Sequence, residues 1–323
     1  MKSRTLLVLL SGEHNTIPEG EARALLLAYD ASASFTHPES RVLLGTTSAE
    51  PEKIARRIAF ARRVGVLLAD PSDAAGIVRG KKIRIRSFRL GREESSESPD
   101  YENLLRGLHD VDVDLRNPDY ELSLIIGERR TYLALTAPGS MHQSWAERRP
   151  RRRPFFHPSA IFPKLSRALV NFTRCKEGDV LLDPFAGTGS LPIEGSEAGL
   201  ACVAADRSRR MAFGALANMN AFQQSWLGVI RADAFSPPLM QVDGIATDIP
   251  YGRASSAGGR DPQTVGDLAT SSLSPLLKTG GRLVIMHPDS VAMKERAGLR
   301  LEEEHHLYIH KKLTRAITVL RKD

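Results

Sequence analysis

Cysteine is scarce in this sequence. Cys175 and Cys202 are the only two among 323 residues, too few for a disulfide framework and too few to complete a four-ligand zinc site. This usage fits a reducing compartment, so we expect a cytoplasmic protein.

Long apolar runs are also missing. Lys2 and Arg4 precede the apolar run 6–10, but this run is shorter than a signal-peptide core and lacks a small-residue cleavage site. No stretch approaches the roughly 20 apolar residues that a membrane helix needs. We therefore expect a soluble protein without a membrane partner, and we interpret 4–10 as a first strand.

The composition has no extreme that would exclude a globular fold. Hydrophobic residues make up 41% and charged residues 26%, which argues against disorder, collagen or coiled coil. The 45 Lys and Arg outnumber the 38 Asp and Glu, and the formal net charge of +7 favours a polyanionic partner. At roughly 150 residues per domain the length predicts about two domains.

Two stretches concentrate positive charge. Residues 79–92 contain seven basic residues and no acid, and residues 148–153 contain five arginines around Pro150. Prolines continue to Pro158, and because proline disfavours helix we expect an extended connector over 148–158. A domain boundary is therefore predicted near residue 150.

The first half alternates short strands and helices. Apolar patterning and proline positions predict an α+β fold, which we divide into a ferredoxin-like unit over 1–70 and a second unit over 71–147. The expected strands are 4–10, 41–46, 82–90, 111–115, 121–126 and 132–137, and the expected helices are 19–29, 50–63 and 101–108, with a polar loop over 93–100.

The second half, 159–323, predicts an α/β fold with a doubly wound, mostly parallel sheet. Strands and helices alternate regularly along it, and its last two strands are expected to form an antiparallel hairpin. The expected helices are 159–173, 191–198, 208–224 and 263–277, and the expected strands are 179–182, 201–205, 228–231, 243–247, 282–286, 307–310 and 316–320.

A glycine turn follows the first strand of this half. Residues 181–190 read Leu-Leu-Asp-Pro-Phe-Ala-Gly-Thr-Gly-Ser and lead into a helix. Open α/β sheets bind ligands at this edge, and Gly187 and Gly189 would let the backbone approach a ligand closely. The turn matches neither the G-x-G-x-x-G dinucleotide fingerprint nor the phosphate loop with its Lys-Ser or Lys-Thr.

Acids end three successive strands. Asp183 could accept hydrogen bonds from an amino group, Asp206 lies where an acid binds ribose hydroxyls, and Asp233 could accept from an adenine amino group. Each acid alone is as consistent with a structural role as with a functional one. Three acids that converge on one crevice favour a nucleoside-containing ligand.

The fourth strand ends in Asp248-Ile249-Pro250-Tyr251-Gly252. A base amine is a poor nucleophile because its lone pair is delocalised, so an enzyme that alkylates it must hold its hydrogens with acceptors. Asp248 and the following carbonyls could do so, and the Tyr251 ring could stack on a flipped base. A plain turn closed by Pro250 and Gly252 is the alternative.

Together these motifs resemble the Rossmann-fold, class I S-adenosylmethionine-dependent methyltransferases that modify amino groups. More narrowly, the chain resembles the archaeal tRNA guanine N2-methyltransferases that act on guanosine 10 and carry an N-terminal THUMP domain. This resemblance extends over nearly the whole chain through 11–14 with Pro18, 115–119, 149–158 and 313–315. The relatives usually have Asp-Pro-Pro-Tyr where this chain has Ile249, and this leaves open whether one or two methyl groups are added.

The resemblance implies S-adenosylmethionine as the co-substrate and tRNA as the partner, gripped by a THUMP domain within 71–147. The catalytic residues would be Asp248, Pro250 and Tyr251. The donor-binding residues would be Asp183, Phe185, Ala186, Gly187, Thr188, Gly189, Asp206, Arg207, Asp233 and Ala234, and the RNA-binding arginines would be Arg84, Arg86, Arg89, Arg149, Arg152 and Arg153.

Two alternative functions stay open. One is a methyltransferase acting on another tRNA guanosine, such as one in the acceptor stem, and the other is a catalytically weak tRNA-binding protein. The sequence is compatible with a monomer and does not fix the oligomeric state. No metal is expected, because His305, His306 and His310 lack the partners of a metal motif, and no G-x-S-x-G motif suggests a hydrolase.

Overall fold

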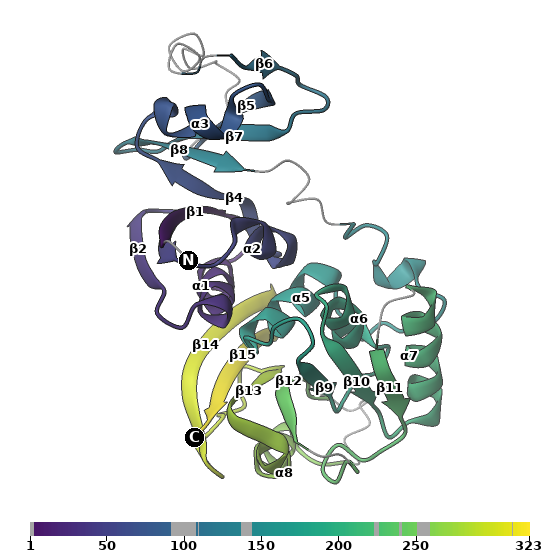
Figure 1. Ribbon diagram of the computed structural model, residues 1–323. Coiled ribbons are helices and arrows are strands. Elements are labelled where there is room, and N and C mark those ends of the chain that lie inside the picture. Colours follow the sequence, from purple (N-terminus) through teal and green to yellow (C-terminus); the bar gives the residue numbers. More distant parts are fainter. Residues whose placement is uncertain are drawn as a thin grey trace. The chain divides into compact units, whose positions relative to one another are not determined.

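The computed structural model describes residues 3–91, 108, 110–136, 144–222, 226–238, 241–250, 259–311 and 313–323. The chain divides into two units, Met1–Gln143 and Ser144–Asp323 (Figure 1). This division falls shortly before the expected connector begins at residue 148. Each unit has its own sheet and is described separately.

An eight-stranded sheet organises the first unit, in the order β2-β3-β1-β4-β8-β7-β5-β6. Its strands are β1 (Arg4–Leu10), β2 (Ser34–Glu39), β3 (Val42–Thr47), β4 (Ala61–Leu68), β5 (Lys82–Arg89), β6 (Asp112–Val113), β7 (Tyr120–Ile126) and β8 (Thr131–Thr136), and its helices are α1 (Ile17–Tyr29), α2 (Pro51–Arg57) and α3 (Ala75–Val78).

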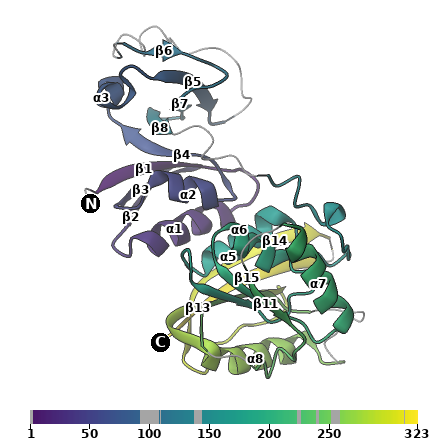
Figure 2. The ribbon, with the colours of Figure 1, turned by 45° about the vertical axis from the view of Figure 1, so that its right-hand side comes forward.

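Apolar side chains bury both faces of this sheet. Helices α1 and α2 cover one face (Figure 2), while the opposite face gathers Leu7 and Leu9 of β1 with Ile125 and Tyr132 of β7 and β8. Strand β4 pairs directly with β8. The sheet therefore continues across the boundary that we expected at residue 70.

The helix predicted over 50–63 was too long. Helix α2 ends at Arg57, and β4 begins four residues later. The cause is a distant side chain: the buried Glu21 carboxylate accepts hydrogen bonds from the backbone N–H groups of Ala59 and Phe60, at 2.9 and 2.8 Å. These bonds satisfy the backbone where the chain turns from helix to strand.

Other differences from the expected elements are local. Strand β2 was missed, because it is largely exposed and contains Pro38. The first helix of the second unit begins at Pro163, since Phe162 is extended. Within the expected connector, Pro150–Arg152 forms a 3-10 turn. The predicted loop over 93–100 and the predicted helix over 101–108 lie outside the described residues, apart from residue 108.

The second unit confirms the doubly wound sheet. Its order is β11-β10-β9-β12-β13-β15-β14, and only the terminal hairpin runs antiparallel to its neighbours. The strands are β9 (Val180–Asp183), β10 (Ala201–Ala205), β11 (Trp226–Ile230), β12 (Val242–Asp248), β13 (Leu277–Pro288), β14 (Leu299–His310) and β15 (Leu313–Lys322); the helices are α5 (Pro163–Phe172), α6 (Ser190–Glu197), α7 (Arg209–Ala221) and α8 (Pro262–Leu273).

Helices cover both faces of this second sheet (Figure 1). Val265, Ala269 and Leu273 of α8 pack against Leu182 and Ile245 of the central strands. On the other side, α6 packs on β9 and β10 between α5 and α7. Strand order reverses at β9, and this reversal fixes the position of the site described below.

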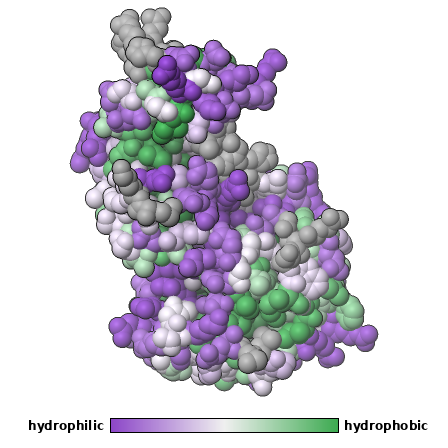
Figure 3. All heavy atoms as spheres, in the orientation of Figure 1, coloured by the Kyte–Doolittle hydropathy of each residue, from purple (hydrophilic) through white to green (hydrophobic). Residues whose placement is uncertain are grey.

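On the face shown in Figure 3, hydrophilic residues predominate and hydrophobic ones form separate areas. Among the helices of the described ranges, none combines the length and the apolar character needed to cross a bilayer.

Candidate functional site

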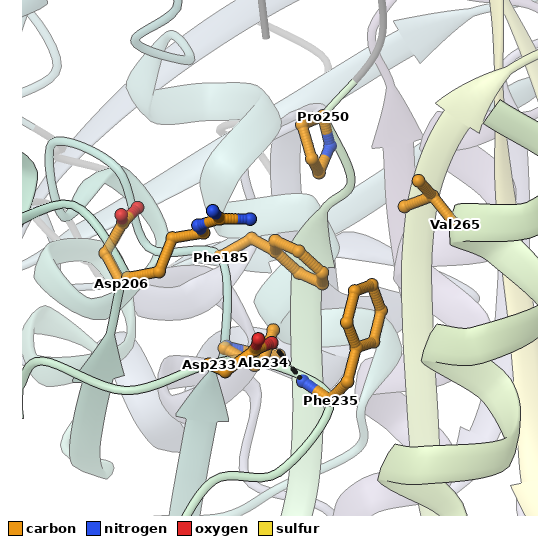
Figure 4. A pocket seen from close by; sticks show the side chains of 9 residues that line it. Phe185, Asp206, Asp233, Ala234, Phe235, Pro250 and Val265 are labelled. Atoms are coloured by element: carbon orange, nitrogen blue, oxygen red, sulfur yellow. Dashed lines mark hydrogen bonds between the residues drawn. The ribbon is translucent and has the colours of Figure 1, made fainter. Parts of the chain in front are cut away.

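A crevice forms where the strand order reverses, at the carboxyl ends of β9 and β12. These strands are neighbours, with Ile245 opposite Leu182, and they end in Asp183 and Asp248. A cleft opens at this edge (Figure 4). Its lining residues are Pro184, Phe185, Asp206, Arg207, Asp233, Ala234, Phe235, Pro250 and Val265.

Three of these lining residues were not among the predicted site residues. Phe235 follows Ala234 directly, so its place in the sequence was a usable signal. Pro184 lies within the glycine-turn motif itself. Val265 comes from α8, and only the packing of that helix on the sheet brings it to the cleft.

Two aromatic rings form an apolar wall of the cleft. The rings of Phe185 and Phe235 meet edge to face, with centroids 5.7 Å apart (Figure 4). Arg260 lies over Phe235 at 5.4 Å. The exposed Asp233 carboxylate accepts a hydrogen bond from the Phe235 backbone N–H, at 3.0 Å. The cleft thus combines an apolar surface for a flat ring with nearby carboxylate acceptors.

Asp206 holds the glycine turn in place. Its Oδ2 accepts the Gly187 N–H at 3.0 Å and its Oδ1 accepts the Ser208 N–H at 2.8 Å. Gly187 and Gly189 have φ values of 52° and 80°, a region that favours glycine. Burial raises the pKa of Asp206, and the two N–H groups oppose this shift. A carboxylate accepts about four hydrogen bonds, so Asp206 retains acceptor capacity toward the cleft.

The other residues of this turn that were predicted to bind the donor make hydrogen bonds inside the protein. Thr188 is buried, with its hydroxyl 3.3 Å from that of Ser190, and the buried Ala186 donates its N–H to the Ala205 carbonyl at 2.9 Å. With Gly187 and Gly189, they do not line the cleft.

Asp183 lies beneath the cleft and does not line it. Its Oδ1 accepts the Thr247 hydroxyl at 2.7 Å and the Phe185 N–H at 3.2 Å. Burial raises the pKa of Asp183 to about 8, and the nearby Asp248 and Asp206 add to this shift. This placement disfavours a direct contact between Asp183 and a ligand in the cleft. Instead, the Asp183 carboxylate stabilises the turn and links β9 to β12.

Replacement of Asp183 by asparagine is expected to stabilise the fold at alkaline pH. The folded-state pKa of about 8 exceeds the ordinary value of 3.8, so folding is progressively disfavoured as the pH rises from about 4 to 8. Asparagine keeps the acceptor and removes the charge. The gain should be on the order of 2 kcal/mol at pH 8 and shrink toward pH 4, as measured by denaturant unfolding; a pH-independent difference would contradict this assignment.

Asp248 is paired with an arginine from the last strand. Arg315 Nη1 donates to Asp248 Oδ2 at 2.9 Å and Nη2 donates to Oδ1, so the contact is bidentate. The two side chains are only 7% and 18% exposed, respectively. Burial raises the pKa of Asp248, and the guanidinium opposes that rise. Arg315 therefore favours the ionised carboxylate that a hydrogen-bond acceptor requires.

Arg315 was not predicted as a site residue. It lies 67 residues from Asp248, and the antiparallel pairing of β15 with β13 places it there, with Arg315 opposite Pro288. The other predicted catalytic positions are Pro250, which lines the cleft, and Tyr251, which lies outside the described residues.

The predicted RNA-binding arginines fall into different environments. Arg89, Arg149 and Arg152 are exposed. Arg84 and Arg86 both pair with the buried Glu121, at 2.7 and 3.4 Å. These two arginines therefore share one carboxylate inside the first unit, and the Arg86 side chain stays 47% exposed.

The predicted RNA-binding role of Arg153 must be corrected, because this residue is buried and does not present its guanidinium to solvent. It donates to the Arg148 carbonyl at 3.0 Å and to the Ser190 hydroxyl at 2.6 Å. Burial lowers the pKa of Arg153 to about 10. This residue ties the connector to the helix that follows the glycine turn.

No cluster of three or more His, Cys, Asp or Glu side chains suited to a metal occurs within the described ranges. His305 stacks on Phe172 with ring centroids 4.8 Å apart and lies 3.2 Å from Glu303, and His306 contacts Asp289. Cys175 and Cys202 are both buried free thiols.

The sheet order, the glycine turn and the acids at the strand ends define the class: this is a Rossmann-fold methyltransferase. Residues 150–316 match the family of RMKL-like methyltransferase domains. The crystal structure of TrmN from Thermus thermophilus shares the fold, with a TM-score of 0.53 and 19% identity over 99% of this chain and 100% of that chain.

Two curated relatives match over almost their full length. The tRNA (guanine(10)-N2)-dimethyltransferase of Methanothermobacter thermautotrophicus is 30% identical over 98% of this chain and 99% of the relative. That of Methanocaldococcus jannaschii is 29% identical over 97% and 99%. The chain belongs to the family of these tRNA (guanine(10)-N2)-dimethyltransferases.

Proposed function

We propose that this protein transfers methyl groups from S-adenosylmethionine to the N2 amine of guanosine 10 in tRNA, in the cytoplasm. The similarity to two relatives with this printed activity, over nearly all of each chain, carries the proposal. The paired Asp248, two residues before the cleft-lining Pro250, supports the proposal independently, because a guanine amine needs an acceptor for its hydrogens.

The cleft fits the co-substrate. S-adenosylmethionine supplies a methyl group activated by its sulfonium. Asp206 can accept from ribose hydroxyls, while Ala234, Phe235 and Val265 offer apolar surface to the adenine.

Asp248 orients the acceptor amine. Its carboxylate, held by Arg315, accepts an amine hydrogen and so keeps the nitrogen lone pair directed at the methyl group. The same carboxylate can take the proton that the amine releases after transfer. Positioning and preorganised charge supply most of the rate enhancement in such a site. Stacking of the base on Tyr251 remains a prediction.

The position of Ile249 weakens the alternative of a catalytically weak protein. Its side chain is fully buried in the core of the second unit, and its N–H donates to the Met286 carbonyl at 3.1 Å. A proline, usual among the relatives, could not make this hydrogen bond. Ile249 therefore allows a hydrogen bond at the end of β12 that a proline would exclude, and the motif retains Asp248 and Pro250 on either side of it.

The test is product analysis. The protein is incubated with S-adenosylmethionine and an unmodified tRNA transcript, the RNA is digested, and the nucleosides are identified by mass. N2-methylguanosine or its dimethyl form is expected, and a transcript with adenosine at position 10 should yield neither. Product from that control would place the target at another guanosine, and no methylated guanosine from any tRNA would overturn the proposal.

Replacement of Asp206 by alanine is expected to weaken donor binding. The change removes an acceptor for the ribose, the hydrogen bond that holds the glycine turn at Gly187, and the one to the Ser208 N–H at the start of α7. The KM for S-adenosylmethionine should rise about 30-fold, which corresponds to roughly 2 kcal/mol, while the Kd for tRNA stays unchanged. A KM within twofold of the wild-type value would remove Asp206 from the donor site.

A further inference from the structure

The connector between the units lies on helix α7. Phe155 N–H donates to Asn218 Oδ1 at 2.8 Å, and Asn218 Nδ2 donates back to the Phe155 carbonyl at 2.9 Å. The Phe155 ring lies against Gly214, where a Cβ would collide with it. The connector is therefore packed on the helix, within the second unit alone.

Arginines alternate with aromatic rings on the surface of the connector and α7. Arg151 lies over Phe156 at 5.9 Å, Arg210 over Phe155 at 5.7 Å, and Arg209 over Phe213 at 5.5 Å. These arginines are exposed, and Phe156 and Phe213 are 45% and 60% exposed. An arginine that stacks on a ring is held in one orientation while its N–H donors remain available at its edge.

The positive charge of this surface is not neutralised. Residues 148–165 and 207–222 contain no aspartate or glutamate. Arg151, Arg152, Arg209 and Arg210 form no ion pair with any acid of the described ranges. They differ in this respect from Arg84 and Arg86, which share the buried Glu121. An unpaired cationic surface with exposed rings therefore lies on the second unit.

We propose that this surface binds the substrate RNA, with the arginines on backbone phosphates and Phe156 and Phe213 against unstacked bases. Phosphates attract unpaired guanidinium groups, and exposed aromatic rings stack on bases without regard to sequence. The surface also adjoins the donor site, because α7 begins three residues after Asp206. This inference rests on the proposed function and adds a tRNA-binding surface on the second unit.

The test compares tRNA binding by three variants of the full chain. Arg209→Ala/Arg210→Ala removes two charges from the surface, and Phe213→Ala removes one ring. The matched control is Arg300→Ala/Arg321→Ala, which removes two exposed arginines that lie opposite each other on β14 and β15, at the other edge of the sheet from β11. The Kd for an unmodified tRNA is measured by fluorescence anisotropy at several salt concentrations.

The two kinds of variant should differ in their salt dependence. Arg209→Ala/Arg210→Ala should raise the Kd about tenfold and lower the slope of log Kd against log salt by about 2. Phe213→Ala should raise the Kd about tenfold with an unchanged slope, because stacking releases no counterions. The control should stay within threefold of the wild-type Kd. All variants should keep the wild-type Tm and Kd for S-adenosylmethionine, since the replaced side chains are exposed and lie outside the cleft.

Two results would overturn the proposal. If Arg209→Ala/Arg210→Ala binds tRNA as tightly as the control while the wild type methylates tRNA, the surface has another partner and the proposed function stands. If the wild type neither binds nor methylates any tRNA, the proposed function fails and this inference fails with it.

Discussion

Replacement of Asp248 by alanine is expected to lower kcat by about 10³-fold or more and to leave the Kd for tRNA within threefold. The change removes the only carboxylate at the end of β12, and with it the acceptor that orients the amine. Methyl transfer from labelled S-adenosylmethionine to tRNA gives kcat, and anisotropy gives the Kd. Unchanged turnover would remove Asp248 from the mechanism.

A second variant separates chemistry from folding. Alanine at position 248 leaves the buried Arg315 guanidinium without its counter-charge, which costs about 3 kcal/mol of stability. Asparagine retains one acceptor for Arg315 and should restore most of this stability. Since it does not restore the negative charge, Asp248→Asn should still turn over at least tenfold more slowly than the wild type.

Replacement of Arg315 by methionine is expected to produce a large loss of stability together with a shift in the pH profile of activity. The guanidinium lowers the pKa of Asp248 against burial, so its removal raises that pKa further. The other titratable groups near Asp248 are Asp183, which is also buried, and His287, whose pKa burial lowers. Neither replaces the lost positive charge at neutral pH.

The direction of the pH effect follows from this rise in the pKa of Asp248. An acid with a raised folded-state pKa disfavours folding increasingly as the pH rises above its unfolded value of about 4. Arg315→Met should therefore lose about 3 kcal/mol at pH 8 and less at pH 5, measured by denaturant unfolding. The acid limb of kcat against pH should move to higher pH, while the KM for S-adenosylmethionine changes little.

Two further variants control this result. Arg315→Lys keeps the charge and loses the bidentate geometry, so it should fall between the wild type and Arg315→Met in stability and in kcat. The double variant Asp248→Asn/Arg315→Met removes both charges and should recover stability without recovering turnover. Equal pH profiles for Arg315→Met and the wild type would show that Arg315 does not act through Asp248.

Local patterns predicted the parts of the site that lie on continuous segments. The glycine turn and Asp206 could be singled out because each follows a short apolar strand, and a parallel sheet brings such strand ends to one edge. The terminal hairpin was expected too, although β14 begins eight residues before the predicted strand. Hydrophobic periodicity was sufficient to predict those strands and helices whose position depends only on their local sequence.

Long-range contacts account for what the sequence did not predict. Arg315 reaches Asp248 only through the register of β15 on β13. The end of α2 depends on Glu21, 38 residues away from Ala59. Arg153 was assigned to RNA because it lies in an arginine run, yet Arg153 and Arg148 are both buried members of that run, and Arg153 donates to Ser190. A charge run does not show which of its side chains the fold buries.

The contact of Phe155 with Gly214 has a consequence for how this sequence can change over generations. Glycine inside a helix costs roughly 1 kcal/mol relative to alanine, so drift would favour a larger residue in the middle of α7. The ring of Phe155 leaves no space for a Cβ there. Positions 155 and 214 are therefore expected to covary among homologues, with a small residue in the helix wherever the connector carries an aromatic one.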